Sequence, residues 1–157
     1  MGKAIAFDLV QSFPDFTVTL ADVDLERASR VAASIDPKRI SPQKIDAQNH
    51  GDVVRLMSQH TVAISAVTFH LNYLLTKAAI EAGSHFCDLG HDDGVVAQQL
   101  TETHRASHAN IAIIANCGLA PGLADILAMD AFQQLDEVDS LHLRAGGLPQ
   151  HPHPPLN

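Results

Sequence analysis

The chain alternates between two kinds of segment, and this alternation restricts its fold more than any other feature. Short runs rich in Val, Ile and Thr, typical of buried strands, cover residues 16–21, 43–46, 61–67, 85–89, 111–116 and 138–145. Longer segments with apolar residues at helical spacing cover residues 25–35, 49–59, 72–82, 95–109 and 121–135. Every strand but the last is followed by a helix, an order that requires parallel strands joined by crossover helices. The sequence therefore predicts an α/β fold with a doubly wound parallel sheet.

Both ends of the chain differ from this pattern. The N-terminus opens directly into a helix, since Gly2 and Lys3 are followed at once by apolar residues at helical spacing. The C-terminal segment GGLPQHPHPPLN, residues 146–157, contains four prolines and is typical of an extended linker. Residues 1–145 are thus predicted to form the folded part of the chain.

Composition narrows the class of protein. An apolar share of 46% in 157 residues suffices for one domain with its own core. The net charge of −8 argues against nucleic acid or an anionic membrane as the main partner. The most apolar stretch, residues 111–129, is interrupted too often by polar residues to span a membrane. Two cysteines, Cys87 and Cys117, fit a reducing compartment, so a cytoplasmic protein is expected.

Gly2 and Asp22 have the spacing of a dinucleotide-binding unit. In such a unit a glycine opens the first helix, and an acidic residue about 20 positions later, at the end of the next strand, binds the adenosine ribose. Asp22 follows Gly2 by twenty residues and ends the predicted strand. A carboxylate there would repel a 2′-phosphate and favour NAD over NADP. A helix-start glycine and a turn aspartate without function would give the same pattern, although Asp24 is the better helix N-cap of the two acids.

Four of the predicted strands end in a similar way, mostly with polar or small residues. These residues are Asp46; Ala66, Val67 and Thr68; Asp88, Leu89 and Gly90; and Asn116, Cys117 and Gly118. Ligands of doubly wound sheets bind outside the carboxyl ends of the strands, so these residues are candidates to surround a cofactor and a substrate. The helix predicted at 121–135 has Pro121 in its first turn and would favour a carboxylate ligand at its start. An ordinary strand–helix connection would show the same residues.

Several segments together resemble the saccharopine dehydrogenase-like family. They are MGKAIAFDLVQS, VTLADVD, NYLLTKAAIEAGSHFCDLG, ANCGLAPGLADILA and LDEVDSLHLRAGGLPQHPHPPLN, in family order over the whole chain. The lysine 6-dehydrogenase branch, which oxidises the ε-amine of L-lysine with NAD, is the most similar in pattern. Saccharopine reductases and carboxynorspermidine dehydrogenases share the pattern, so the exact amine substrate stays open.

The resemblance implies a Rossmann-like domain without its first strand and without most of its Gly-rich loop, whose last glycine corresponds to Gly2. The tail would lead toward an absent second domain for substrate binding and dimerisation. We therefore expect a fragment, inactive alone, of a homodimeric NAD-dependent amino-acid dehydrogenase. Loss of a central strand would leave the chain marginally stable, with open edges on the strands at 16–21 and 61–67.

The resemblance also implies roles for individual residues. The residues expected to bind NAD, with NADP the less favoured cofactor, are Gly2, Asp22, Asp46, Ala66, Val67, Thr68 and Asn72. Those expected to line the pocket of the amino-acid substrate are Gly90, Gly118, Pro121 and Gly122. The candidates for catalysis are Asp88 and His91 as acid–base groups, and Cys117 as part of the pocket rather than as a nucleophile.

Other functions stay open at this point. The chain would also fit a catalytically silent dinucleotide-binding remnant, or a sister enzyme that acts on saccharopine or carboxynorspermidine. No metal site is expected, because His104 and His108 share a helix face without any accompanying zinc-binding motif.

Overall fold

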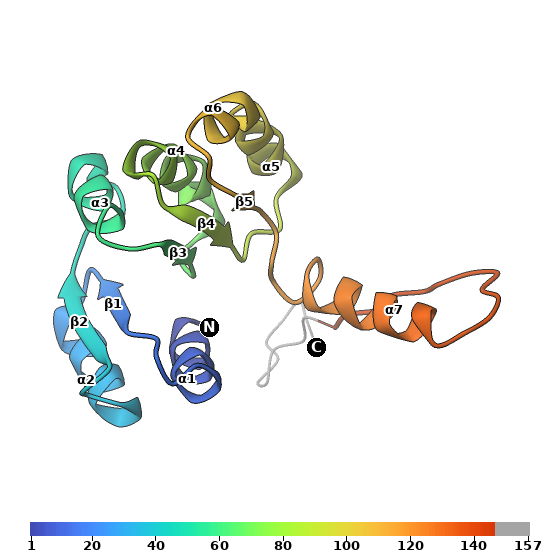
Figure 1. The fold of residues 1–157 in the computed structure, drawn as a ribbon, viewed down its shortest axis with the longest axis horizontal. Coiled ribbons are helices and arrows are strands. Elements are labelled where there is room, and N and C mark those ends of the chain that lie inside the picture. Colours follow the sequence, from blue (N-terminus) through green and yellow to red (C-terminus); the bar gives the residue numbers. More distant parts are fainter. Residues whose placement is uncertain (147–157) are drawn as a thin grey trace, which may run out of the picture.

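The computed structural model describes residues 1–146 and contains alternating strands and helices (Figure 1). The strands are β1 (Val18–Asp22), β2 (Ile40–Lys44), β3 (Val62–Ser65), β4 (His85–Asp88) and β5 (Ile113–Ile114). The helices are α1 (Gly2–Ser12), α2 (Leu25–Ile35), α3 (His50–Met57), the short 3-10 helix η1 (Phe69–Leu71), α4 (Asn72–Ala82), α5 (Asp93–Leu100), α6 (Thr103–His108) and α7 (Leu123–Gln133). This order confirms the predicted α/β fold. Apart from Gly146, the linker predicted at 146–157 lies outside the described residues.

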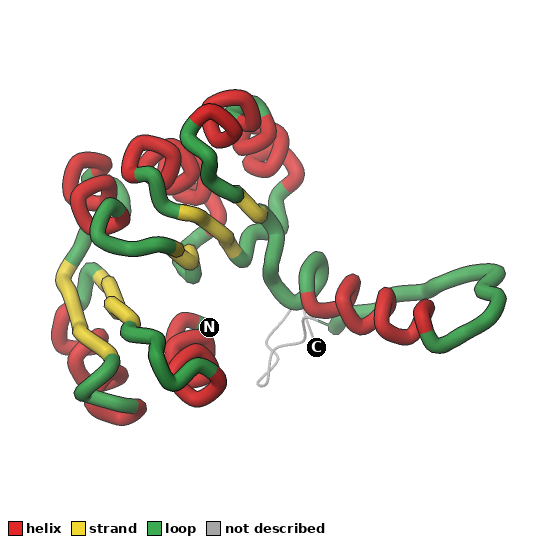
Figure 2. Tube along the Cα trace, viewed as in Figure 1, coloured by secondary structure: helices red, strands yellow, loops and turns green. Residues whose placement is uncertain are grey.

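The strands form two separate parallel sheets. One contains β1 and β2, and the other has the order β3–β4–β5. Figure 2 shows the yellow strands of the two sheets as distinct groups. Within residues 1–146, β1 and β3 each pair on one side only, so each has an open edge.

Each sheet has an apolar core of its own. Beside β1 and β2, residues of α1 and α2 pack against Ile40; they are Ala6, Val10 and Ala32. Beside β3 and β4, residues of α3 and α4 pack against Phe86; they are Val53, Met57, Leu75, Ala78 and Ala79. Each sheet is thus packed against a pair of helices of its own.

Two helices, α2 and α4, match their predicted bounds, and a local signal fixes one end of each. Asp24 caps α2 by accepting a hydrogen bond of 3.0 Å from the backbone N–H of Arg27. Gly83 ends α4 in the left-handed conformation, with φ of 69°. Neither these helices nor any other within residues 1–146 has the length and apolarity to cross a membrane.

Two predicted elements are wrong. Residues 138–145 form no strand, because an alternating sequence becomes a strand only where a neighbouring edge offers backbone partners. The helix predicted at 95–109 is divided into α5 and α6. The hydroxyls of Thr101 and Thr103 donate to the carbonyls of Gln98 and Leu100, and such side-chain bonds compete with continuation of a helix.

Most other predicted bounds shift by a few residues, and three of these shifts have a clear local cause. β2 covers Ile40–Lys44 rather than 43–46, because the buried Ile40 anchors its start. β5 is limited to Ile113–Ile114, and Asn116 beyond it has a left-handed backbone, with φ of 60°, which ends the strand. Pro121 lies before α7 rather than in its first turn, since the N-cap is Gly122, whose N–H donates to the carboxylate of Asp125.

Arg39 fixes the position of α1. Its guanidinium donates to the carbonyls of Val10, at 2.7 Å, and Pro14, at 3.0 Å, near the end of the helix. The same side chain pairs with Asp36 at 2.9 Å, and this hydrogen bond is the main reason that the pKa of Asp36 is lowered. One arginine thus ties α1 to the start of β2.

We expect Arg39→Met to lower the free energy of unfolding by about 1.5–3 kcal/mol, because it removes hydrogen bonds from a charged donor. The matched control is Arg30→Met, since the ion pair of Arg30 with Glu26 is solvent-exposed and is expected to contribute less than about 1 kcal/mol. Urea denaturation of both variants at neutral pH tests this. Equal losses in the two variants would contradict the role of Arg39.

Candidate functional site

A cavity of about 1210 Å³ lies between β1 and β3 and is called the central cavity below. Five of the residues predicted to bind the cofactor line it: Gly2, Asp22, Ala66, Val67 and Thr68. They come from the start of α1, the end of β1 and the segment after β3. Residues from separate parts of the sequence thus meet at the carboxyl ends of two strands, where doubly wound sheets bind ligands.

The start of α1 is suited to an anion. A Cβ atom on Gly2 would lie 3.7 Å from the Cβ of Ala66, so the helix begins against the end of β3. No side chain caps this end, and its first turn contains no acidic residue. The N–H groups and the positive end of the helix dipole therefore act together on a negatively charged group.

Asp22 is held at the end of β1 in a defined orientation. Its Oδ1 accepts a hydrogen bond of 3.0 Å from the N–H of Asp24. Asp22 is half-buried and lines the central cavity. The cations Arg27 and Lys3 line the same cavity. The carboxylate is thus available to hydroxyl groups of a ligand, with two cations bordering the same cavity.

Two predicted cofactor residues do not line the central cavity. Asp46 is exposed, and its carboxylate accepts a hydrogen bond from the N–H of Gln48. Asn72 is almost fully buried at the start of α4, where its Oδ1 accepts a 2.7 Å hydrogen bond from Ser65. Asn72 therefore links α4 to β3, and the N-cap of α4 is Leu71.

Asp88 is the centre of a buried polar network at the end of β4. The residue has 0% exposure, and its Oδ1 accepts from the N–H groups of Gly90, at 2.7 Å, and Asn116, at 3.4 Å. Its Oδ2 accepts from the amide of Gln99 at 2.8 Å, and Gln99 also donates to Thr76. The carboxylate at the end of β4 thus binds α5 and the segment after β5, and Gln99 connects this group to α4.

Gly90 lies where no larger residue fits. A Cβ atom at this position would be 2.7 Å from Asp88 Oδ1 and 3.0 Å from Asn72 Nδ2. It would also be 3.3 Å from Asn116 Oδ1, a buried oxygen for which residues 1–146 provide no hydrogen-bond donor. The predicted pocket residue Gly90 is therefore packed among polar groups from the end of β4, the start of α4 and the segment after β5.

The other catalytic candidates lie near this network. The ring of His91 is exposed and lies 4.7 Å from the ring of Phe69, centroid to centroid. Burial and the nearby Asp88 carboxylate raise the pKa of the Cys117 thiol, and burial raises the pKa of Cys87 to about 11. Both thiols are thus protonated at neutral pH, which disfavours their action as nucleophiles.

The remaining pocket candidates lie beyond β5. The N–H of Leu123 donates to the carbonyl of Gly118 at 2.9 Å, which closes a turn around Pro121 and Gly122. None of the residues from Cys117 to Gly122 lines the central cavity. From this turn α7 extends away from both sheets (Figure 1).

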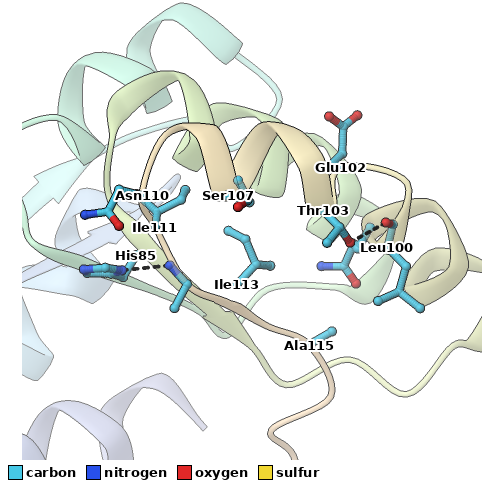
Figure 3. A pocket seen from close by; sticks show the side chains of 12 residues that line it. His85, Leu100, Glu102, Thr103, Ser107, Asn110, Ile111, Ile113 and Ala115 are labelled. Atoms are coloured by element: carbon cyan, nitrogen blue, oxygen red, sulfur yellow. Dashed lines mark hydrogen bonds between the residues drawn. The ribbon is translucent and has the colours of Figure 1, made fainter.

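A second cavity, of about 580 Å³, borders β5 and the helices α5 and α6 (Figure 3). Several of its polar groups already have hydrogen-bond partners within the protein. Glu102 binds Tyr73 and Arg105, and the ring of His85 accepts the N–H of Ala112. It contains no predicted site residue. We therefore place the candidate site at the central cavity and the adjoining network of Asp88.

Sequence reasoning missed three members of this network: Ser65, Thr76 and Gln99. Thr76 follows Asn72 by one helical turn, and that spacing was a usable signal. Ser65 and Gln99 lie in segments where the sequence gives no local sign of the partner that a polar residue binds.

Solved structures with a similar fold include two oxidoreductases. Saccharopine dehydrogenase (L-Glu forming) of Saccharomyces cerevisiae matches with a TM-score of 0.71 and 17% identity, over 85% of this chain and 28% of that one. An NAD-binding oxidoreductase of Klebsiella pneumoniae matches with a TM-score of 0.55 and 22% identity, over 85% of this chain and 35% of that one. At these identities the likeness concerns the fold, and the chain spans only about a third of either protein.

The sequence itself identifies the family. The family model described as the saccharopine dehydrogenase NADP binding domain matches residues 1–114, which is most of the chain and includes α1 to β5. This agrees with the parallel sheets and with the cavity that unites Gly2, Asp22 and Thr68. The chain belongs to the family of saccharopine dehydrogenase NADP-binding domains.

Proposed function

We propose that this chain binds a nicotinamide dinucleotide at the rim of the central cavity and belongs to an oxidoreductase that acts on a C–N bond of an amino acid. The observation that carries the proposal is the meeting of Gly2, Asp22 and the segment Ala66–Thr68 in one cavity, beside the uncapped start of α1. Each of these groups suits a different part of a dinucleotide.

In this proposal Asp22 accepts hydrogen bonds from the adenosine ribose, and Asp46 lies nearer the adenine. The start of α1 binds the pyrophosphate through its N–H groups. Ala66, Val67 and Thr68 run along the dinucleotide toward its nicotinamide. The cofactor supplies the hydride chemistry, and the protein positions the reacting groups and excludes water.

The substrate pocket is proposed at Gly90, Gly118, Pro121 and Gly122, with His91 and Cys117 at its border. Asp88 is fully buried, and its carboxylate is occupied by three hydrogen-bond donors. This arrangement favours a positioning role: Asp88 holds the segment that contains Gly90. The likeness to lysine 6-dehydrogenase supports an amine of L-lysine as the reacting group, in a cytoplasmic homodimer formed with a second domain.

We propose NAD as the cofactor, because the carboxylate of Asp22 would repel the 2′-phosphate of NADP. NADP is the second candidate. Arg27 and Lys3 border the central cavity, and either cation would attract that phosphate.

Titration of the 157-residue chain with NADH and NADPH, followed by nicotinamide fluorescence, tests the proposed binding directly. We expect saturable binding of NADH. A parallel assay of NADH formation from NAD with L-lysine, saccharopine or carboxynorspermidine separates binding from turnover. Failure to bind either dinucleotide at millimolar concentration would contradict the proposal, whereas binding without turnover agrees with a cofactor domain.

Asp22→Ser is expected to lower the preference for NADH over NADPH about tenfold or more, because a charge-assisted hydrogen bond is lost and repulsion is relieved. Asp24→Ser is the matched control: it makes the same change two residues away and keeps a residue able to cap α2. An unchanged ratio of the two dissociation constants in Asp22→Ser would remove Asp22 from the site.

Asp88→Asn is expected to lower the free energy of unfolding by about 1–3 kcal/mol, since an amide in place of the carboxylate leaves a buried donor without a partner. Asp46→Asn, at an exposed aspartate that also accepts one backbone N–H, is the control and should change stability by less than about 0.5 kcal/mol. Urea denaturation gives both values. A loss no larger in Asp88→Asn than in the control would contradict the positioning role.

A further inference from the structure

The second cavity, which borders β5, α5 and α6, has the size of a small-molecule site (Figure 3). Its volume of about 580 Å³ falls within the range of about 300–1,000 Å³ that is usual for such sites. Within residues 1–146 it shares no lining residue with the central cavity. It is therefore a separate place on the molecule, outside the proposed dinucleotide site.

Gln99 brings an unpartnered hydrogen-bond acceptor to this cavity. The residue lines the cavity and is only 5% exposed. Its amide nitrogen donates to Thr76 Oγ1 and to Asp88 Oδ2, each at 2.8 Å. Both N–H bonds are thus in use, and a reversed amide would bring its oxygen against the Asp88 carboxylate. The orientation of the amide is therefore fixed, and its Oε1 is buried without a donor from residues 1–146.

An acceptor of this kind favours a ligand that donates a hydrogen bond. A buried oxygen that has lost its water without gaining a donor destabilises the protein, and native structures contain few such groups. The Gln99 amide cannot turn to find another partner, because both of its N–H bonds are engaged. An N–H group that enters the cavity would therefore remove a penalty that the chain alone leaves in place.

Glu102 gives the cavity a negative charge. The residue is 8% exposed, and its carboxylate accepts hydrogen bonds from Tyr73, at 3.1 Å, and from Arg105, at 2.7 Å. Each carboxylate oxygen accepts one of these bonds and has a lone pair left for a second donor. The side chain of Arg105 is more than half exposed and lies outside the cavity lining. The charge that faces the cavity is therefore that of the carboxylate.

His85 adds a donor to the cavity without adding a charge. Its Nδ1 accepts the N–H of Ala112 at 2.9 Å (Figure 3), so the proton of the ring lies on Nε2 and the ring is neutral. No lysine or arginine within residues 1–146 lines the cavity. The electrostatics of the cavity thus favour a cation over an anion.

Apolar side chains form the rest of the walls. Leu100 lines the cavity at the end of α5, Ala106 lines it from α6, and Ile111 and Ile113 line it at β5. These side chains suit the hydrocarbon part of a ligand, because their contact removes apolar surface from water. The lining therefore matches a molecule with a cationic donor and an apolar body.

We propose that this second cavity binds a small organic ammonium ion with an apolar body. The ammonium group donates to the Glu102 carboxylate and to Gln99 Oε1, and the apolar body packs against Ile111 and Ile113. The charge-assisted hydrogen bonds give selectivity for a cation, and burial of the apolar body adds affinity.

Titration of the intact chain with benzylammonium chloride, followed by two-dimensional NMR of the backbone amides, tests the proposal. We expect saturable shifts of the amide signals of Thr103, Ser107 and Ile111, with a dissociation constant in the millimolar range. Benzyl alcohol has the same apolar body without the charge and should bind at least about tenfold more weakly. Added NADH should leave the affinity for benzylammonium unchanged, since the two cavities share no lining residue within residues 1–146.

Glu102→Gln separates the charge of the cavity from its shape. The variant keeps an oxygen for Tyr73 and should bind benzylammonium about tenfold more weakly, with the affinity for benzyl alcohol unchanged. The matched control is Glu26→Gln, since Glu26 also pairs with an arginine one turn along the chain but lies outside the cavity lining. This control should bind both ligands as the unaltered chain does. A further variant, Ser107→Leu, narrows the cavity from an exposed position on α6 and should weaken the binding of both ligands.

Several results would overturn the proposal. They are shifts that do not saturate, displacement of benzylammonium by NADH, equal binding of the two ligands by the unaltered chain, and equal affinity of Glu102→Gln and Glu26→Gln for benzylammonium. The comparison of the two ligands on the unaltered chain decides the matter even if Glu102→Gln does not fold.

Discussion

A single buried carboxylate determines how the strand ends of the larger sheet are arranged. Removal of a charge from water is costly unless hydrogen bonds replace the lost hydration, and three donors do so at Asp88. One donor follows β4, one belongs to α5 and one follows β5. Their positions are therefore linked, and the close packing around Gly90 follows from this convergence on one group.

In the smaller sheet, the hydrogen bonds of one side chain connect a helix to a strand. Here the long side chain of Arg39 connects the carbonyls at the end of α1 with Asp36 before β2. The start of the same helix lies against Ala66, which follows β3 of the other sheet. α1 is thus held at one end by its own sheet and meets the other sheet at its opposite end. That contact places the helix start, Asp22 and Thr68 around one cavity.

Local signals were sufficient for the features that depend on local chemistry. The bounds of α2 and α4 follow from Asp24, Gly83 and the spacing of apolar residues. The separation of twenty residues between Gly2 and Asp22 identified two residues that line one cavity. Features that depend on distant partners were missed. Residues 138–145 alternate like a strand but find no edge to pair with, and Gln99 gives no sign in the sequence that it binds Asp88. The placement of Asn72 inside the protein also required the position of Ser65.

None of the residues of α7 is buried, and its large apolar side chains Ile126, Leu127 and Met129 are each more than half exposed. A helix of eleven residues is close to the length at which isolated helices melt in water, because few internal hydrogen bonds compensate for nucleation. Packing of an apolar face normally makes up this deficit. The stability of α7 as a helix therefore depends on what contacts it. An apolar surface packed against α7 would make its backbone hydrogen bonds longer-lived.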